Sequence, residues 1–374
     1  MKINFWTSTE YGGFMNALMS KLRVNGIEAS QRFNILEATY RSARSTSQRL
    51  LLRLRQYIVY PMQLSLNLFY EALKGNANRP VVVATNTFFA PLLATFFNKR
   101  VVHLVYDLFP EAMIHSGKWK EGQFKVRFFR WLVGLSLKRS ATNIFLGERL
   151  KKYVESIHGD LPNSEIIAVG ADESPFPKLE SLEDTESISI LYCGNFGNMH
   201  ESETLFDAWQ FGINDSFQFL FHCSGPKRKD LELFQKKHKS ELDDRLQVSE
   251  GLSNEEWIKV MQSSEIALVT MSEGAQEVVM PSKTYSAMMA GQAILAVAPE
   301  DSDLVDLIKA ADCGWWVAPG DVQGFQECLS IIQSDRQLLL EKRQNAFRVA
   351  HEQFGQGCLA KQWVEVFESL QKRV

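Results

Sequence analysis

The sequence predicts an α/β protein built from two doubly wound parallel-sheet domains. Short apolar segments alternate with segments of helical periodicity through both halves of the 374-residue chain, which is the pattern of strand–helix–strand units. Many of the apolar segments are continuous, as expected of parallel strands that are buried on both faces. A chain of this length can form two cores of normal size.

The alternation also places the domain boundaries. We expect a first domain at residues 1–170, a proline-containing acidic linker at 171–187, a second domain at 188–350 and a last helix at 351–374 that crosses back. The expected strands are 2–8, 81–86, 101–107, 143–147 and 166–170 in the first domain, and 188–193, 218–223, 246–249, 266–271, 293–298 and 315–318 in the second. Ligands of such sheets bind at the carboxyl ends of the strands, so we expect the site in a cleft between the domains.

The two halves carry opposite net charge. Residues 1–170 hold 23 Lys and Arg against 11 Asp and Glu, whereas residues 171–374 hold 18 against 33. A basic half suits an anionic membrane, a phosphate-bearing substrate or nucleic acid. No recognised nucleic-acid motif accompanies the charge, so we expect no nucleic-acid partner. The plain alternative is two unlike surfaces that attract each other across a cleft.

Two basic amphipathic segments in the first half favour contact with a membrane surface. Residues 39–70 hold five arginines and no acid, with leucines at helical spacing. The segment 118–140 places Phe124, Phe128 and Trp131 at helical spacing among lysines and arginines. Basic helices with an aromatic face are typical of the bilayer interface. The alternative for each segment is a core helix with solvated cations.

The cysteines and the N-terminus indicate the compartment. Five cysteines are scattered without a CxxC pair, and the first residues lack the apolar core of a signal peptide. Both features favour a cytoplasmic protein with reduced thiols. With the basic first half, they predict a peripheral protein on the cytoplasmic face of the inner membrane.

Small-residue turns after the expected strands form a candidate anion site. Glycine lets backbone N–H groups approach a ligand, and the helix that follows directs its positive end toward the same point. A further loop precedes a helix that Ser253 and Glu256 are expected to cap. The candidate binding residues in these turns are Gly12, Gly13, Gly194, Asn195, Gly197, Gly225, Lys227 and Leu252.

The stretch PSKT, residues 281–284, adds a cation at a helix start. Pro281 suits a first helical turn, and Ser282, Lys283 and Thr284 follow it. A surface lysine there opposes the helix dipole by about 0.3–1 kcal/mol, whereas a bound diphosphate reverses the sign. The alternative is an exposed lysine that tolerates its position. Taken with the glycine turns, Lys283 favours an anionic ligand.

The stretch PSKTYSAMMAGQAILAVAPEDSDLVDLI, followed by CGWWVAPGD, resembles the donor-binding region of GT-B glycosyltransferases of retaining family 4. LYCGNFG, CSGPKRKDLE, VGADESPF and the N-terminal EYGGFMNALMSKLRVNGIEA resemble other segments of that family. VYDLFPEAM is similar to members that build bacterial surface polysaccharides. The resemblance spans the chain and implies two Rossmann-like domains that face a cleft.

The chain departs from the family at a pair of glutamates. Val278 and Ser286 stand where relatives often have glutamate. Ser286 removes the usual carboxylate contact to the ribose, although some polysaccharide-assembly members carry serine there. Glu273 and Glu277 are candidates to replace the first glutamate. Asp107 is the candidate carboxylate of the acceptor domain, or else a strand-end cap.

The resemblance implies a hexosyl- or N-acetylhexosaminyltransferase that retains anomeric configuration. A UDP- or GDP-type nucleotide-sugar would be its donor substrate, and a lipid-linked sugar or growing surface glycan would be its acceptor. We expect no metal and no cofactor; Asp301 and Asp303 match the letters of a DxD motif but lie in an acidic helix start. Two alternatives stay open: an NDP-sugar epimerase on the same scaffold, and a non-catalytic nucleotide-sugar- or lipid-binding protein.

Overall fold

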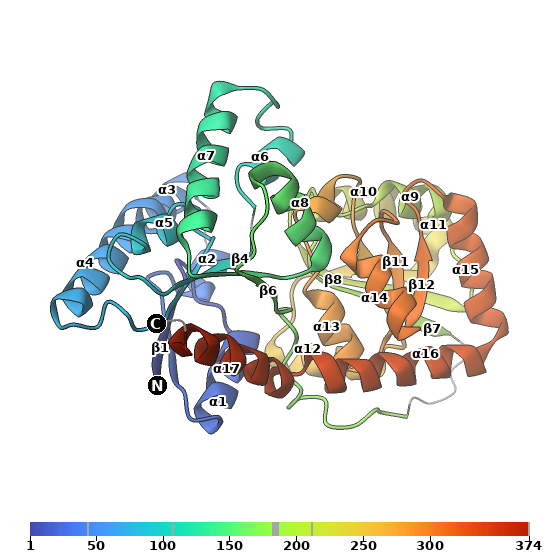
Figure 1. Ribbon diagram of the computed structural model, residues 1–374. Coiled ribbons are helices and arrows are strands. Elements are labelled where there is room, and N and C mark those ends of the chain that lie inside the picture. The colour runs from blue at the N-terminus through green and yellow to red at the C-terminus, as the bar shows by residue number, and fades with distance from the viewer. Residues whose placement is uncertain (43–44, 107, 182–186, 211, 373–374) are drawn as a thin grey trace. The chain divides into compact units, whose positions relative to one another are not determined.

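The computed structural model describes residues 1–42, 45–106, 108–181, 187–210 and 212–372. The chain divides into two compact units, Met1–Val169 with Gln356–Val374 (unit 1) and Gly170–Gly355 (unit 2). Each unit contains one six-stranded parallel sheet flanked by helices (Figure 1). The predicted fold class, α/β with two Rossmann-like units, is therefore confirmed. No helix of the described residues is long and apolar enough to cross a membrane.

The sheet of unit 1 has the strand order β2-β1-β3-β4-β5-β6. Its strands are β1 (Lys2–Trp6), β2 (Glu28–Arg32), β3 (Val81–Ala84), β4 (Val101–Val105), β5 (Thr142–Phe145) and β6 (Ser164–Ile166). Its helices are α1 (Gly13–Val24), α2 (Glu37–Ser42), α3 (Thr46–Leu54), the π-helical turn η1 (Arg55–Val59), α4 (Tyr60–Leu73), α5 (Ala90–Ala94), α6 (Glu111–His115), α7 (Phe124–Arg139), α8 (Glu148–His158) and α17 (Gln356–Lys372). Strand β2 was not predicted, because its sequence EASQR has no apolar run.

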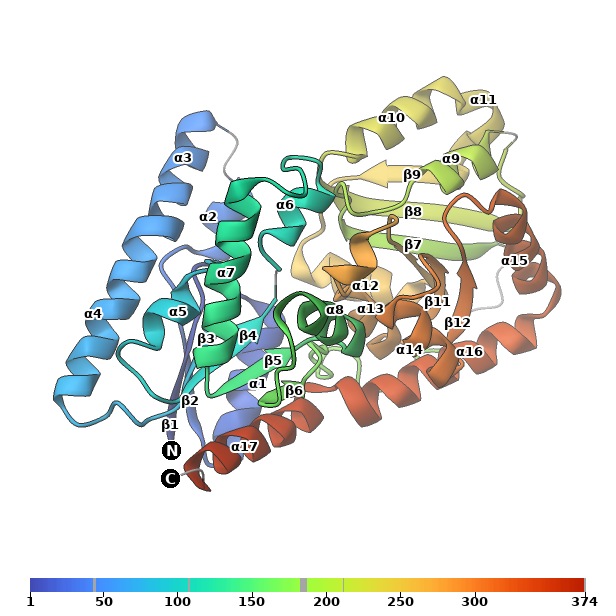
Figure 2. The same cartoon turned by 45° about the horizontal axis from the view of Figure 1, so that its top comes forward.

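Successive residues of β1 anchor the helices on opposite faces of this sheet. Phe5 contacts Trp363 and Phe367 of α17, with ring centroids 5.2 and 6.2 Å apart. Trp6 lies 6.3 Å from Tyr60 of α4. Since alternate side chains of a strand point to opposite faces, α17 and α4 cover different sides of the sheet (Figure 2).

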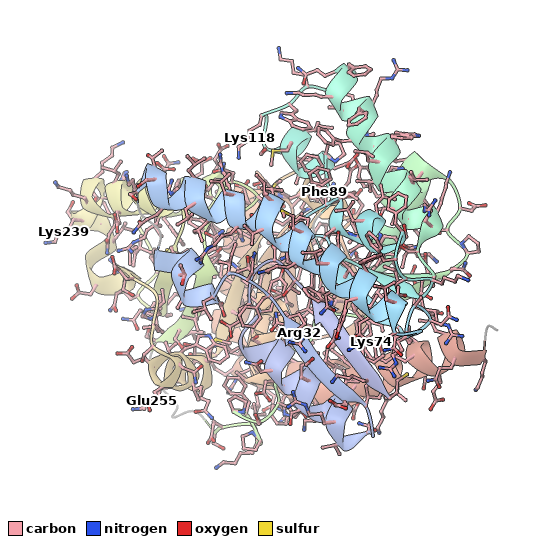
Figure 3. The ribbon with its side chains drawn as sticks, turned by 90° about the vertical axis from the view of Figure 1, so that its left-hand side faces the viewer. Arg32, Lys74, Phe89, Lys118, Lys239 and Glu255 are labelled. Atoms are coloured by element: carbon pink, nitrogen blue, oxygen red, sulfur yellow. The ribbon has the colours of Figure 1, made fainter. Side chains whose placement is uncertain are left out.

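The helices α3 and α4 form one continuous run through η1 (Figure 3). Ser45 and Gln48 close its N-terminus with a reciprocal capping box. The 28 residues Thr46 to Leu73 would span about 42 Å at 1.5 Å per residue. A π-helical turn inside a long helix often marks a functional site.

The sheet of unit 2 has the order β12-β11-β10-β7-β8-β9. Its strands are β7 (Ile188–Asn195), β8 (Phe217–Ser224), β9 (Leu246–Ser249), β10 (Ile266–Thr270), β11 (Ala293–Val297) and β12 (Gly314–Val317). All six strands expected in the second domain are therefore present. Counted along unit 2 from its other edge, the order is 3-2-1-4-5-6, and the topological switch point lies between β7 and β10.

The helices of unit 2 surround a core rich in aromatic rings. They are α9 (Glu203–Trp209), α10 (Arg228–Lys237), α11 (Lys239–Leu242), η2 (Asp243–Arg245), α12 (Asn254–Ser263), η3 (Ala275–Glu277), α13 (Lys283–Met289), α14 (Asp303–Ala311), α15 (Val322–Ser334), α16 (Arg336–Val349) and η4 (Ala350–Phe354). Tyr192 stacks on Phe221 at 5.2 Å, and Trp209 meets Phe219 edge-on at 4.8 Å. These rings hold β7 and β8 rigid beneath the turns at their carboxyl ends.

Candidate active site

The candidate site of unit 2 lies at the carboxyl ends of β7 and β10, the switch point of the sheet. Doubly wound sheets bind ligands at such points because the connections leave the sheet toward opposite faces there. The turns after β7 and β8 pack on each other, since Phe196 N donates to Ser224 O at 2.6 Å. The segment that leads from β10 into α13 adds Lys283.

The Nζ of Lys283 is a buried cation that faces an aromatic ring rather than a hydrogen-bond acceptor among the described residues. It is the first residue of α13, and its Nζ lies 3.6 Å from the centre of the Tyr192 ring. In the described part of the chain, this buried Nζ has no hydrogen-bond partner. Burial lowers the pKa of Lys283 to about 7, because the charged form loses its hydration. The alternative of an exposed lysine is therefore wrong, and an anion at Nζ would recover the lost stabilisation.

A small cavity of about 70 Å³ lies beside Lys283. Ser286, one helical turn further along α13, lines it together with Cys193 of β7 and Trp257 of α12. Two more polar atoms near the switch point, Thr270 Oγ1 and Thr284 Oγ1, are buried without a described partner. Buried polar groups are normally satisfied, so each of these atoms is a candidate to bond a polar ligand.

The glycine turns pack backbone against backbone. Gly225 has φ +106°, and a Cβ there would lie 2.6 Å from both Phe196 O and Asn195 Oδ1. Gly194 also has a positive φ, +125°. A Cβ on Gly197 would lie 2.8 Å from Asn195 Nδ2. Glycine is thus required for the two turns to interlock, whether or not a ligand also uses their N–H groups.

Lys227 and His200 have structural partners. Lys227 Nζ donates to His200 O at 2.5 Å and to Ser202 Oγ at 3.2 Å, which holds the loop after β7. His200 Nδ1 accepts from Gly197 N at 3.1 Å. Burial, and then the nearby charge of Lys283, lower the pKa of His200 to about 3, so its ring is neutral at ordinary pH. Lys283 is left as the cation of this cluster with no described partner.

The other candidates of unit 2 surround α13 and α12. Helix α13 begins at Lys283, two residues later than the expected start at Pro281. Pro281 is buried, and Ser282 is exposed. Glu273 is exposed and Glu277 ends η3. Leu252 is half-buried. The predicted capping box of α12 is confirmed: Ser253 Oγ accepts from Glu256 N, and the Glu256 carboxylate accepts from Ser253 N at 2.9 Å.

Two predicted residues lie in unit 1, and one cannot be placed. Gly12 N donates to a carboxylate oxygen of Glu37 at 3.1 Å, so an internal anion already meets this turn. A Cβ on Gly12 would lie 2.5 Å from that oxygen. Gly13 is the first residue of α1. Asp107 lies outside the described residues.

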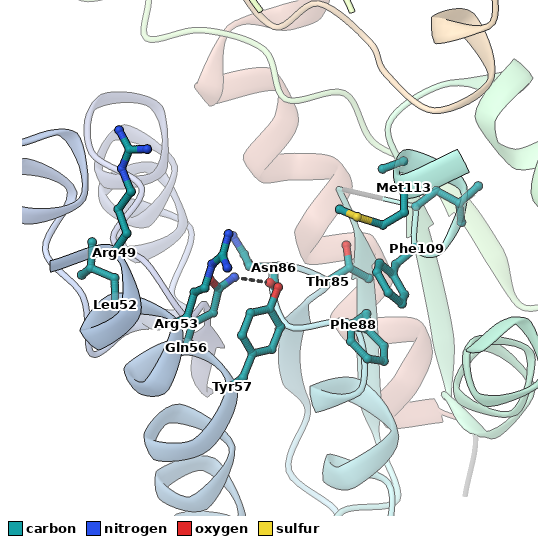
Figure 4. Close-up of a pocket in the computed structure, with 12 residues that line it drawn as sticks. Arg49, Leu52, Arg53, Gln56, Tyr57, Thr85, Asn86, Phe88, Phe109 and Met113 are labelled. Atoms are coloured by element: carbon teal, nitrogen blue, oxygen red, sulfur yellow. Dashed lines mark hydrogen bonds between the residues drawn. The ribbon is translucent and has the colours of Figure 1, made fainter. Parts of the chain in front are cut away.

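A second cavity, of about 520 Å³, lies in unit 1 and was not predicted (Figure 4). Arg49, Arg53 and Gln56 line one side, while Asn86 and Phe109 follow strands β3 and β4. The sequence contained part of the signal, since the two arginines are spaced by one helical turn. The other side could not be predicted, because it comes from two loops far away in the chain.

Comparisons with known proteins agree with this architecture. Residues 187–335 match the family model described as "Glycosyl transferases group 1". The "Probable glycosyltransferase WbjE" of Pseudomonas aeruginosa is 27% identical over 274 residues, which cover 68% of this chain and 66% of that relative. The chain thus spans slightly less than two thirds of the length of this relative.

Two solved structures share the fold over nearly the whole chain. HepE of Anabaena, solved in complex with UDP, superimposes with a TM-score of 0.71 at 12% sequence identity. The match covers 99% of this chain and 100% of the HepE chain. WaaG, a glycosyltransferase involved in lipopolysaccharide biosynthesis, superimposes with a TM-score of 0.67 at 13% sequence identity. This match covers 98% of this chain and 99% of the WaaG chain. The chain therefore has the GT-B fold, and its residues 187–335 are similar to the family described as "Glycosyl transferases group 1".

Proposed function

We propose that the protein transfers a sugar from a nucleotide-sugar to a lipid-linked or polysaccharide acceptor in bacterial surface glycan synthesis. The observation that carries this proposal is the buried Nζ of Lys283, which has no hydrogen-bond partner among the described residues and lies near the switch point in the region similar to the group 1 family. A diphosphate at this point would pair the cation and keep it protonated. HepE with its bound UDP and WaaG with its role in lipopolysaccharide synthesis support the same class of reaction.

The chemistry would be departure of a nucleoside diphosphate from the sugar. Charge develops on the leaving diphosphate, and a pre-positioned ammonium stabilises it without reorganisation. Ser286 offers the ribose a hydroxyl where many relatives would offer a carboxylate. Glu273 and Glu277, just before α13, stay candidates for contacts to the donor sugar. Hexosyl or N-acetylhexosaminyl transfer with retention remains part of the proposal.

A donor screen tests this function. Purified protein is mixed with UDP- and GDP-sugars and a bacterial membrane extract, and sugar should reach a lipid or glycan fraction as nucleoside diphosphate is released. Lys283→Ala should weaken nucleoside-diphosphate binding tenfold or more, since a charged hydrogen bond contributes about 1.5–3 kcal/mol. Lys259→Ala, an exposed lysine of α12, is the matched control and should change affinity less than twofold.

The same experiment separates the alternatives. An epimerase would convert the donor sugar without acceptor, and a non-catalytic binding protein would bind the nucleotide without turnover. Absence of transfer with every donor, while nucleotide binding persists, would remove the transferase proposal.

We also propose that unit 1 binds the surface of an anionic membrane. Side chains spaced by three or four residues along the α3–η1–α4 run are large, apolar and at least 45% exposed. We call this set the apolar stripe; its members are Leu51, Leu54, Ile58, Met62, Leu66, Phe69 and Leu73. On α7, Phe124 is 82% exposed and Trp131 61%, so the core-helix alternative is wrong for these side chains.

Cations lie over two further exposed rings of unit 1, as at a bilayer interface. Arg139 lies over the exposed ring of Phe96 at 4.9 Å, and Lys74 lies 4.0 Å over Tyr70. Such basic residues add attraction to anionic lipid, which salt weakens. The protein should float with phosphatidylglycerol vesicles at low salt and less at high salt. Protein that stays at the bottom of the gradient at low salt would exclude membrane binding.

A further inference from the structure

The 520 Å³ cavity of unit 1 joins a cationic wall to an aromatic wall. Arg53, Gln56 and Tyr57 lie on the helical side, and Phe88 and Phe109 lie on the other (Figure 4). Gln56 Nε2 donates to Asn86 O at 2.6 Å, which ties the helix to the loop after β3. Thr87 Oγ1 donates to Gln56 O at 3.0 Å in the same place. Pockets of 300–1,000 Å³ are typical of small-ligand sites.

Among the described residues, the cationic wall has no counter-ion. Arg49 and Arg53 are one helical turn apart, and neither forms an ion pair or side-chain hydrogen bond with a described residue. The described lining residues include no carboxylate. Like charges at this spacing repel each other, so an anion between them stabilises the arrangement. Guanidinium groups bind phosphate oxygens in pairs, which favours a phosphate-bearing ligand.

The other wall and the neighbouring surface favour an amphiphile. Phe88 and Phe109 stack with centroids 4.2 Å apart, and Phe129 packs edge-on against both rings. This rigid aromatic face suits the C–H face of a sugar ring or an isoprene unit. The helical run that supplies the arginines also carries the apolar stripe, which begins at Leu51. One helix thus offers both an anion site and an apolar surface.

We propose that this cavity binds the diphosphate of an acceptor in which a sugar is joined through diphosphate to a polyisoprenoid lipid. Arg49 and Arg53 hold the diphosphate, the Phe88–Phe109 face receives the sugar, and the lipid chain follows the apolar stripe into the bilayer. This inference rests on the proposed function, because it identifies the acceptor of that transfer.

Calorimetry with farnesyl diphosphate, a soluble analogue, tests the site. All variants carry Lys283→Ala, so that the nucleotide site contributes little binding. Arg49→Gln with Arg53→Gln should lower the affinity at least tenfold, because each lost charged hydrogen bond is of that order. Arg32→Gln with Arg55→Gln, two exposed arginines outside the cavity, is the control and should stay within twofold. An equal loss of affinity in the two double variants, or no loss in the Arg49/Arg53 variant, would overturn the proposal.

Further ligands identify the source of the phosphate. Farnesol, inorganic diphosphate and soluble dihexanoyl phosphatidylglycerol should each bind at least tenfold more weakly than farnesyl diphosphate. Inorganic diphosphate at equal affinity would indicate a free-anion site, and the phospholipid at equal affinity would indicate a bilayer headgroup site. Either result would overturn the assignment to a lipid-linked acceptor.

Transfer assays with Lys283 intact separate this inference from the proposed function. The Arg49/Arg53 variant should raise KM for a prenyl-diphosphate-linked sugar at least tenfold, while nucleoside-diphosphate affinity and the circular dichroism spectrum stay unchanged. Transfer by a protein that does not bind farnesyl diphosphate would overturn the inference alone. Binding through the two arginines without transfer from any donor would instead remove the proposed function.

Discussion

Unit 1 and unit 2 have the same type of sheet but differ in what their surfaces expose. Of the 23 exposed large hydrophobic side chains among the described residues, 19 belong to unit 1 and four to unit 2. Unit 2 buries its large rings, such as Trp209 and Tyr192, and its unusual feature is the buried cation Lys283. The sheet alone requires only that its own faces be covered. The excess apolar surface of unit 1 supports the membrane contact proposed above, and the buried cation of unit 2 supports the proposed anionic donor.

The largest expected effect is the difference in the free energy of unfolding between two tryptophan variants, one in each unit. Trp209 is 1% exposed in the core of unit 2, so Trp209→Ala should lower the free energy of unfolding by about 3–5 kcal/mol. Trp131 is 61% exposed in unit 1, so Trp131→Ala should change it by less than about 0.5 kcal/mol. Urea unfolding of both variants measures the difference. Similar losses would mean that Trp131 packs against protein.

The apolar stripe should matter for vesicles and little for folding. Leu54, Ile58, Met62 and Leu66 are changed to serine together. Binding to phosphatidylglycerol vesicles should fall roughly 100-fold, because each substitution removes apolar surface that would otherwise enter the bilayer. Vesicle co-sedimentation measures the change.

The four large apolar side chains that are exposed in the described part of unit 2 provide the control for this experiment. Replacing them with serine should leave vesicle binding unchanged; they are Leu233, Val279, Ile331 and Leu340. If these substitutions reduce vesicle binding as much as those in the apolar stripe do, the two units do not differ in membrane contact.

The buried lysine predicts a smaller, pH-dependent effect. The pKa of Lys283 is about 7, so the lysine loses its charge above pH 7, whereas a bound diphosphate would keep it protonated. Nucleoside-diphosphate affinity should fall by up to tenfold per pH unit between pH 7 and 9. Calorimetry at several pH values measures this slope, and Lys283→Met should remove it. A slope that persists in the variant would assign the titration to another group.

The free energy of unfolding, measured without added nucleotide, should change with pH in the opposite direction. The pKa of Lys283 is lowered from 10.5 to about 7 on folding, so the unfolded chain binds more protons between these values. The contribution of Lys283 to stability therefore rises with pH through this window. Comparison of urea midpoints of the wild type and Lys283→Met at pH 7 and pH 9.5 checks the sign.

Much of the fold could be predicted because its signals are local. The strands β10 and β11 of unit 2 are nearly continuous apolar runs, and the Ser253–Glu256 box needs only four consecutive residues. Strand β2 could not be predicted, since this polar edge strand exists through its pairing with β1. The 520 Å³ cavity likewise depends on α3 meeting the loops after β3 and β4.

The sequence by itself determined that a lysine stands at the start of a helix, after a strand and before an Ala- and Gly-containing turn. The tertiary structure alone decided that its Nζ is buried over Tyr192, a residue of β7 far away in the chain. It likewise decided that Lys227 is held by the loop carrying His200. Periodicity and capping depend on neighbours within about four residues, whereas the environment of a charge depends on every segment that the fold brings around it.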